Sequence, residues 1–215
     1  MKQSKYNALL RMLSVSVVFT FVILIIRIFF TGNLHYANYF WNIFLASIPV
    51  LFASLLLKRN WHLLLSAFFF VSWLLFLPNA PYLITDLIHY EPRKDFPGWA
   101  DILLVTSASW NGLLLGFISI MMIEDWLSIY FKKNLQNLIV IVCLALTGYG
   151  IYLGRYLRYN TWDIITNPVP LFYDTMSTIM APFHHPRAWG FTILFGSMYA
   201  IFYYTLRQLS TMRNP

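Results

Sequence analysis

Apolar runs of bilayer length fill most of this 215-residue chain. A transmembrane α-helix needs about 20 mostly apolar residues, because each residue advances the helix by about 1.5 Å and the hydrocarbon core is about 30 Å thick. The runs that come within a few residues of this length are 8–30, 39–57, 63–78, 102–123, 138–155 and 188–206. They leave no segment long enough for a soluble domain. They therefore predict an all-α fold: one integral membrane helical bundle over residues 1–215, with about six transmembrane helices.

Composition agrees with this prediction. Hydrophobic residues make up 59% of the chain and charged residues only 11%, whereas about one quarter of a typical soluble protein is charged. The first apolar run follows a basic start but is too long for a signal peptide and has no cleavage site after it, so we expect it to be retained. The single cysteine, Cys143, lies within the fifth run and can form no internal disulfide.

The positive charges of the chain predict its orientation. Lysine and arginine concentrate in cytoplasmic segments of membrane proteins. With the N-terminus inside, the inner segments carry the cations Lys2, Lys5, Arg11, Lys58, Arg59, Lys132, Lys133, Arg207 and Arg213 and the acids Glu124 and Asp125. The outer segments carry the cations Arg27, Arg93, Lys94, Arg155, Arg158 and Arg187 and the acids Asp86, Glu91, Asp95, Asp101, Asp163 and Asp174. The net charge of +7 is then an inside charge, which predicts both termini in the cytoplasm and gives no indication of nucleic-acid binding.

Two longer connections fall on the predicted outer side, residues 79–95 and 159–187. Both contain prolines, and the second is also rich in apolar residues. A segment of this length and composition is typical of short helices that lie at the membrane surface. Such a segment either roofs a pocket or only fills the interface.

The string LPNAP at residues 77–81 predicts a break in the third span. Asn79 can cap a new helix through its side-chain oxygen, and Pro81 is tolerated in a first turn. One interpretation is a half-helix whose N-terminus points at an anionic group. The alternative is a helix that leaves the membrane and lies flat on its surface.

On the restarted helix, Tyr82, Asp86 and His89 share one face, being spaced by four and three residues. Asp86 and His89 are the candidate catalytic pair, because an aspartate beside a histidine can orient a general base. A metal site would need a third ligand, with only His184 or His185 at hand, and no metal-binding spacing supports one. The structural alternative is an Asp–His hydrogen bond that fixes the helix in position at the membrane interface.

Candidate substrate-binding residues also follow the fifth span. Arg155 and Arg158 lie on the outer side against the general charge bias, and a guanidinium group binds phosphate or carboxylate through two parallel hydrogen bonds. The alternative is internal ion pairing with Asp163, Asp101 or Asp86. The complete set of predicted ligand contacts is Asn79, Tyr82, Arg155, Arg158, Asp163 and Asn111.

Polar residues within the spans have a structural and a functional interpretation. Asn111 in the fourth span, with Ser107 and Ser109 before it, either lines the floor of a cavity or forms hydrogen bonds between helices. Arg27 lies three residues from the end of the first span. We expect its long side chain to reach out to the interface.

Four strings resemble the hallmark blocks of a membrane-protein family, domain of unknown function 1361. They are WNIFLASIP, LFLPNAPYLITDLIH, SWNGLLLGF and YLGRYLRYNTWD, and the resemblance extends from the second span to the sixth. It implies a small, multi-pass and mostly bacterial membrane protein of the plasma membrane. It implies no activity, so no catalytic role follows from it.

Three functions are compatible with these residues. The first is an envelope enzyme, in which the arginines hold an anionic or lipid-linked ligand and Asp86 with His89 performs acid–base chemistry. The second is a small-solute transporter, which would need a polar path to the cytoplasmic side, where ionisable residues are scarce within the spans. The third is a non-catalytic assembly partner. Cofactors, the oligomeric state and the reaction itself are left open by the sequence.

Overall fold

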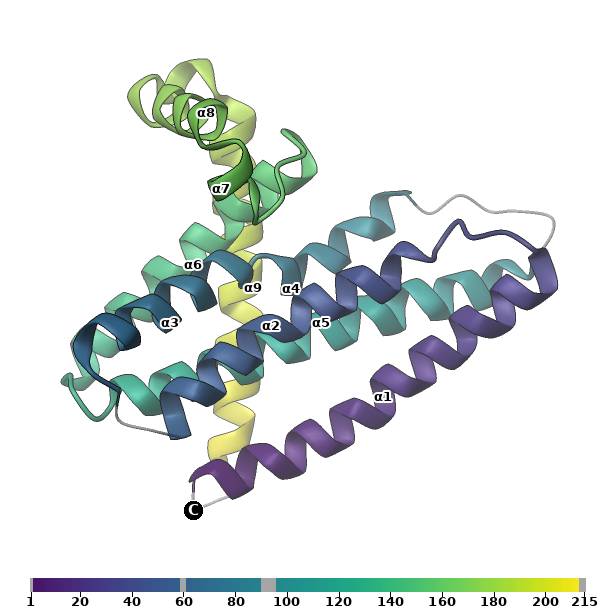
Figure 1. Cartoon of the computed structure of the whole chain (residues 1–215), viewed down its shortest axis with the longest axis horizontal. Coiled ribbons are helices and arrows are strands. Elements are labelled where there is room, and N and C mark those ends of the chain that lie inside the picture. The colour runs from purple at the N-terminus through teal and green to yellow at the C-terminus, as the bar shows by residue number, and fades with distance from the viewer. Residues whose placement is uncertain (1, 59–60, 90–95, 213–215) are drawn as a thin grey trace. The chain divides into compact units, whose positions relative to one another are not determined.

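The computed structural model describes the backbone of residues 2–58, 61–89 and 96–212, and the side chains of these residues except those of 2–5, 89 and 210–212. Within this part of the chain every regular element is a helix (Figure 1). The predicted all-α membrane fold is therefore confirmed. The charged residues Arg59, Glu91, Arg93, Lys94, Asp95 and Arg213, and residues 90–95 of the first predicted interfacial segment, lie outside the described residues.

Five helices are long and apolar enough to cross a membrane. They are Tyr6–Thr31, Asn38–Lys58, Leu63–Ile88, Gly98–Leu127 and Lys133–Arg155. A further helix, Pro186–Met212, is 27 residues long and covers the sixth predicted run, but it is not among the five that combine length with apolarity. The sixth span, and with it the cytoplasmic C-terminus, stays a prediction.

The chain divides into two compact units, Met1–Tyr130 and Phe131–Pro215. Unit 1 contains α1 (Lys2–Thr31), α2 (Asn38–Lys58), α3 (Leu63–Phe76), α4 (Asn79–Tyr82), η1 (Leu83–His89) and α5 (Gly98–Leu127). Unit 2 contains α6 (Lys133–Arg155), α7 (Asp163–Thr166), α8 (Pro168–Met180), η2 (Pro182–His184) and α9 (Pro186–Met212). Each unit is described by itself.

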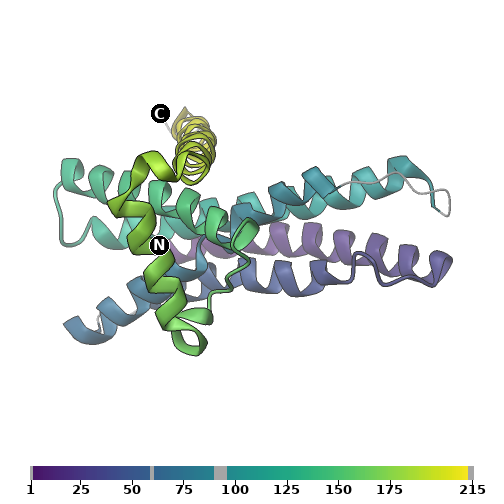
Figure 2. The same cartoon turned by 90° about the horizontal axis from the view of Figure 1, so that it is seen from above.

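Helix α5 is the core of unit 1. The most apolar part of α5 is 67% buried, against 22% for α1. This accords with the small and polar residues among the buried positions of α5 and with the many exposed aliphatic and aromatic side chains of α1. Helices α1, α2 and α4 and the 3₁₀ helix η1 all pack against α5, and α3 packs against α2 (Figure 2). Trp73 of α3 is fully buried and donates its indole N–H to the Ser119 hydroxyl of α5 (3.1 Å).

The predicted break at Pro78 is present, because α3 ends at Phe76 and α4 begins at Asn79. The expectation that Asn79 caps the new helix is wrong, since Pro78 is the N-cap residue of α4 and no side chain caps that helix. Leu77 and Pro78 both keep right-handed helical angles. The Ala80 N–H donates to Leu77 O (3.1 Å), which leaves the Phe76 carbonyl without its usual backbone donor, and the Asn79 side-chain amide donates to that carbonyl instead (2.9 Å). A carbonyl within an apolar bundle needs such a donor, so the Asn79 side chain acts at this break as a donor to Phe76 O and not as a cap through its oxygen.

Close packing keeps this segment inside unit 1. A Cβ atom on Gly112 of α5 would collide with the carbonyl oxygen of Ala80 and with the Leu83 side chain. Ala80, Pro81 and Leu83 are themselves buried. The segment therefore packs on α5 and is not a helix lying flat away from the bundle.

Unit 2 is built on an α6–α9 pair. The two helices approach closely at Gly148, where an added Cβ would lie 2.5 Å from Thr192 O and 2.9 Å from Gly196 N. Helices α7 and α8 connect the ends of this pair (Figure 1). The Tyr159 hydroxyl donates to Asp174 of α8 (2.7 Å), and the Trp189 indole donates to Thr178 O (3.2 Å).

The outward face of the 159–187 segment is apolar. The strongly exposed side chains are Ile165, Val169, Phe172, Tyr173, Met180 and Phe183. Such exposure supports the predicted position at a membrane surface, which stays a prediction because the structure contains no lipid.

Candidate functional site

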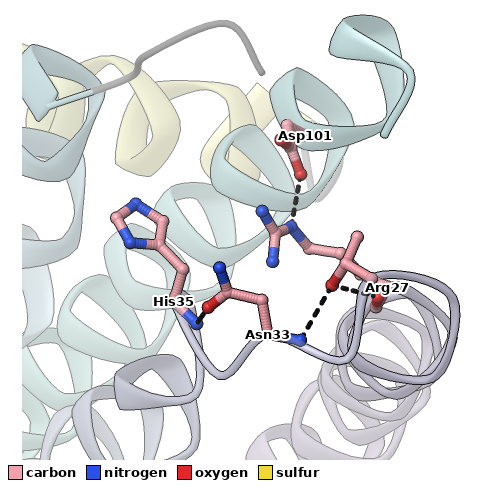
Figure 3. A network of polar contacts seen from close by, with 5 residues as sticks. Arg27, Asn33, His35 and Asp101 are labelled. Atoms are coloured by element: carbon pink, nitrogen blue, oxygen red, sulfur yellow. Dashed lines mark hydrogen bonds and ion pairs between the residues drawn. The ribbon is translucent and has the colours of Figure 1, made fainter. Parts of the chain in front are cut away.

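A buried ion pair joins α1 to α5. The Arg27 Nε donates to Asp101 Oδ1 at 2.7 Å, and both side chains are completely shielded from solvent (Figure 3). Arg27 lies near the end of α1, and Asp101 lies in the first turn of α5. The two helices therefore run antiparallel, with the pair at one end of unit 1, which we call the Arg27 end.

This pair corrects the expectation that Arg27 reaches out to the membrane interface. The expectation used only the distance of Arg27 from the end of its own span. It did not consider an acidic partner on another span, and the Asp101 carboxylate lies beside Arg27 on α5. Removing both charges from water is tolerable because each neutralises the other at hydrogen-bond distance.

The remaining surroundings of Arg27 are aromatic. The guanidinium carbon lies 4.4 Å from the centre of the Tyr36 ring and 5.8 Å from that of Phe96. Nη1 and Nη2 of Arg27 and Oδ2 of Asp101 are buried and have no hydrogen-bond partner within the described part of the chain. A guanidinium group has five N–H donors, so most of the hydrogen-bonding capacity of Arg27 is not used by the described residues.

The loop after α1 lies beside this pair. Gly32 has φ +62°, and an added Cβ there would meet nothing within 4 Å. The Asn33 N–H donates to the Thr31 hydroxyl (3.2 Å), and the Asn33 side-chain oxygen accepts from the His35 N–H (2.9 Å). In Figure 3 the terminal nitrogens of Arg27 point toward the side on which Asn33 and His35 carry their side chains. Asn33 is half-buried and His35 is exposed, so this loop is the side from which solvent approaches.

Deeper in unit 1, α1 and α5 share a second polar contact, the α1–α5 polar row of Ser16, Thr20, Ser107 and Asn111. The hydroxyls of Thr20 and Ser107 are hydrogen-bonded at 2.5 Å. The Asn111 amide nitrogen donates to Thr20 Oγ1 (2.8 Å) and to Ser16 O (3.3 Å). For Asn111 and Ser107 the structure thus supports hydrogen bonding between helices, not the floor of an open cavity.

The candidate catalytic residues lie on η1. Asp86 is half-buried, with its Oδ2 shielded from solvent. The Thr85 hydroxyl donates to Tyr82 O (2.5 Å), which tightens the turn that carries Asp86. His89 is the last residue of η1, and its side chain lies outside the described part of the structure.

The pairing of η1 with α5 shows to which end of unit 1 Asp86 belongs. Ala80 lies against Gly112, and Leu83 O accepts from the Ser109 hydroxyl (3.0 Å). Positions that increase along α4 and η1 thus pair with positions that decrease along α5. Asp86 is displaced from Leu83 toward the start of α5, and therefore toward the Arg27 end.

The other predicted ligand contacts lie in unit 2. Arg155 is the last residue of α6, and Arg158, three residues on, has φ +60°, a conformation that is uncommon for a residue with a side chain. Asp163 accepts hydrogen bonds from the Asn160 N–H (2.6 Å) and the Thr166 hydroxyl (2.9 Å). Chiefly the Asn160 N–H holds the pKa of Asp163 below its ordinary value, with a smaller opposing effect of burial.

The predicted site is thus divided between the units. Unit 1 contains Asn79, Tyr82, Asp86, His89 and Asn111, and unit 2 contains Arg155, Arg158 and Asp163. Whether the two sets form one cavity stays a prediction. In the described residues, no three His, Cys, Asp or Glu side chains gather as metal ligands would.

The sequence analysis missed Arg27 and Asp101 as a unit. The signal was present in the spacing: Ser16, Thr20 and Arg27 fall four and seven residues apart, on one face of a helix. Asp101 and Asn111, ten residues apart, form the matching face of α5. Two polar faces of equal depth on antiparallel spans predict a helix pair.

Comparison with known proteins gives one family. The model of the family described as "Protein of unknown function (DUF1361)" matches residues 41–202. No curated protein and no solved structure is similar enough to the chain to match it.

Proposed function

Because the chain belongs to the DUF1361 family, whose description names no activity, we propose its function from its own residues. It is a multi-pass protein of a bacterial plasma membrane that binds an anionic or lipid-linked ligand at the Arg27 end of unit 1. This end faces the outside of the cell, in keeping with the excess of lysine and arginine in the segments at the other end.

The observation that carries this proposal is the unused hydrogen-bonding capacity of Arg27. Its Nη1 and Nη2 are buried without a partner among the described residues, while only Nε is bonded to Asp101. Leaving charged donors unsatisfied in an apolar place is costly. A phosphate or carboxylate group repays that cost, because it accepts two parallel hydrogen bonds from the Nη1–Nη2 edge.

The same end offers groups for chemistry on the ligand. Asp86 is held on η1 by the packing of Leu83 and Thr85, both buried, against α5. Asp86 and His89 are proposed as the acid–base pair, since a positioned carboxylate beside an imidazole can move a proton to or from a bound ligand. Arg155, Arg158 and Asp163 of unit 2 stay proposed ligand contacts.

A small-solute transporter is less well supported. The α1–α5 polar row extends polar contacts below the Arg27 end, and Tyr6 donates to Asp125 (2.9 Å) near the opposite end. Between these two levels the α1 face toward the core carries the buried Leu13, and α5 carries buried Ile118 and Met122. The buried Ser119 of this stretch has its hydroxyl bonded to Trp73 and to Gly116 O. Apolar packing of this kind opposes the passage of a polar solute.

The proposal is tested on protein purified with its native lipids. Wild type should carry an anionic or lipid-linked molecule that mass spectrometry identifies, and Arg27→Gln should lose most of it. Arg11→Gln is the matched control, because Arg11 lies on the same helix and is exposed. Equal retention by wild type and Arg27→Gln would contradict a site at Arg27.

The chemical part of the proposal needs separate variants. Asp86→Asn and His89→Ala should leave the protein inserted, folded and able to hold the ligand, but remove the phenotype that complementation of a deletion strain restores. Arg155→Lys should do the same if unit 2 contributes to the site. Failure of each variant to accumulate in the membrane would make these residues structural.

A further inference from the structure

The buried Arg27–Asp101 pair is electrically neutral, but it leaves both hydrogen-bond donors and a hydrogen-bond acceptor unused by the described residues. Two donor nitrogens of Arg27 and one acceptor oxygen of Asp101 have no partner within the described residues. A simple anion would satisfy only the donors. It would leave Asp101 Oδ2 without a donor and add a net negative charge where no water reaches it, so a ligand that also carries a positive group fits the pair better than an anion alone.

We infer that the ligand of this site is a zwitterion, an oxyanion and a protonated amine within one small group. The oxyanion takes the two free donors of Arg27, and the ammonium takes Asp101 Oδ2. The site then contains two positive and two negative charges, and every charged group has a partner of opposite sign. This inference deepens the proposed function, on which it rests, by naming the class of ligand.

The geometry of Arg27 shows on which edge such a ligand would bind. The N–H donors of a guanidinium group lie in its plane, whereas aromatic rings interact with its faces. Tyr36 covers a face at 4.4 Å, and Asp101 occupies the Nε side. The Nη1–Nη2 edge remains, and it points toward the loop of residues 32–37 (Figure 3).

Two further features favour an oxyanion at this edge. Helix α5 is 30 residues long, starts beside the pair, and has no side chain capping its N-terminus. The positive end of its dipole attracts an oxyanion there. The Asn33 side chain uses its oxygen for the His35 N–H, so its amide nitrogen faces the same region with N–H donors (Figure 3).

Access requires movement of the loop, because the pair itself is fully buried. The loop carries Gly32 at positive φ with open space around it. Beside it on α1, Phe29 and Phe30 are 84% and 72% exposed. Acyl chains could lie against these rings while a headgroup enters from the loop side. The zwitterion can thus belong to a phospholipid such as phosphatidylethanolamine or to a free molecule such as glycerophosphoethanolamine, in both of which the phosphodiester carries one negative charge.

The test compares headgroups on the full-length protein. Protein in nanodiscs is titrated with phosphatidylethanolamine, phosphatidylglycerol and phosphatidylcholine, and bound lipid is counted by native mass spectrometry. A second arm adds free glycerophosphoethanolamine to protein in neutral detergent and follows the thermal unfolding temperature. Wild type should prefer phosphatidylethanolamine over both other lipids by on the order of tenfold, the range of one charge-assisted hydrogen bond. A shift with glycerophosphoethanolamine but no lipid preference would assign the site to the free molecule.

The variants separate the two halves of the ligand. Asp101→Asn should abolish the preference for the ethanolamine headgroup over glycerol, while Arg27→Gln should weaken all phosphate-bearing ligands. Arg11→Gln should behave as wild type. Asn33→Ala changes a residue of the loop, and it tests the site if Arg27→Gln and Asp101→Asn do not fold. It should weaken phosphatidylethanolamine binding several-fold without changing the amount of protein in the membrane.

The outcomes distinguish this inference from the proposed function. Equal binding of phosphatidylglycerol and phosphatidylethanolamine, lost in Arg27→Gln, would overturn the zwitterion and keep the anion site. No binding of any phosphate-bearing probe would overturn both. If neither Arg27→Gln nor Asp101→Asn folds, two results would still overturn the inference. One is equal binding of the three headgroups by wild type, and the other is a preference for phosphatidylethanolamine that Asn33→Ala leaves unchanged.

Discussion

At the scale of single residues, Arg27 and Asp101 depend on each other. Removing one partner of a buried ion pair leaves the other charge uncompensated, which costs about 3–5 kcal/mol, whereas replacing both by apolar residues often costs little. We therefore expect Arg27→Met and Asp101→Leu each to lower the free energy of unfolding by about 3–5 kcal/mol. The double variant should lose much less than their sum.

A double-mutant cycle of unfolding in mixed micelles measures this coupling. Arg11→Met provides the control, because Arg11 is exposed on the same helix and should change stability by less than about 0.5 kcal/mol. Additive losses in the double variant would show that the two side chains do not stabilise each other.

In unit 2, Asp163 predicts a response to pH. The pKa of Asp163 is lowered mainly by the hydrogen bond from the Asn160 N–H. A lowered pKa in the folded state means that the stabilisation is complete above the unfolded value of about 4 and is lost as the pH falls through the lower, folded value. The protection factor of the Asn160 amide, which is its exchange rate relative to an unfolded amide at the same pH, should therefore fall on acidification below about pH 4.

Asp163→Asn should remove this acid response while leaving the protection of the amides in α6 unchanged. Thr166→Val should reduce it only in part, because the Thr166 hydroxyl is the weaker of the two donors. An acid response of the same size in Asp163→Asn would assign it to another group.

The residue types in a sequence indicate which groups need hydrogen-bond or ion-pair partners, but not where in the fold these partners lie. Asp86, His89 and Asn111 could be singled out because polar residues are rare in an apolar chain. The partner of Asn111 proved to be Thr20, 91 positions away. Arg27 was misjudged for the same reason, since its partner depends on which two spans pack together and at what depth.

At the scale of elements, α6 and α9 depend on glycine for their close approach. Gly148→Ala would place a Cβ 2.5 Å from Thr192 O, so the two backbones must separate. We expect a loss of about 1–3 kcal/mol in the stability of unit 2, the usual cost of overpacking. Thermal unfolding of the purified protein measures it.

Gly190→Ala is the matched substitution on α9, because nothing lies within 4 Å of its added Cβ. In a helix, alanine is favoured over glycine by about 0.8–1 kcal/mol, so this variant should be neutral or slightly more stable. If both substitutions had the same effect, packing at Gly148 would not explain the helix pair.

The third span shows which features of a helix can be predicted from the sequence and which cannot. The prolines at 78 and 81 rightly indicate an irregular helix, because each lacks an N–H. They do not determine whether the chain turns away. Here the freed Phe76 carbonyl is satisfied by Asn79, and Gly112 allows α5 to approach, so the helical course continues. Such compensation comes from neighbours that no local pattern contains.

At the scale of the whole molecule, bilayer-length runs were enough to predict the fold class. Five of the six predicted spans coincide with helices that are long and apolar enough to cross a membrane. The division into two units, at Tyr130, has no comparable signal in the sequence, because it depends on which helices pack together.

The number of spans decides the side on which the C-terminus lies. With six spans and the N-terminus inside, a C-terminal tag should be protected from reagents added outside the cell, whereas five spans would expose it. Replacing the only cysteine, Cys143, by serine gives a background in which single cysteines can be introduced. A cysteine at Asp163 should then react with a membrane-impermeant thiol reagent in intact cells.

Protection of that cysteine, with labelling only after the cells are opened, would reverse the orientation of the chain. A cysteine at Lys132 is the counterpart on the predicted inner side. Its side chain is exposed, so it should react only in opened cells.

The separation of Arg27 from Asp101 along the chain also bears on biogenesis. During synthesis Arg27 enters the membrane 74 residues ahead of its counter-ion. Until α5 emerges, the flexible stem of Arg27 lets the guanidinium group reach the lipid phosphates. Asp101 then attracts this group inward, so that α1 is fixed in place only once α5 has been made. A ribosome stalled before that point would leave α1 free to slide and rotate in the bilayer.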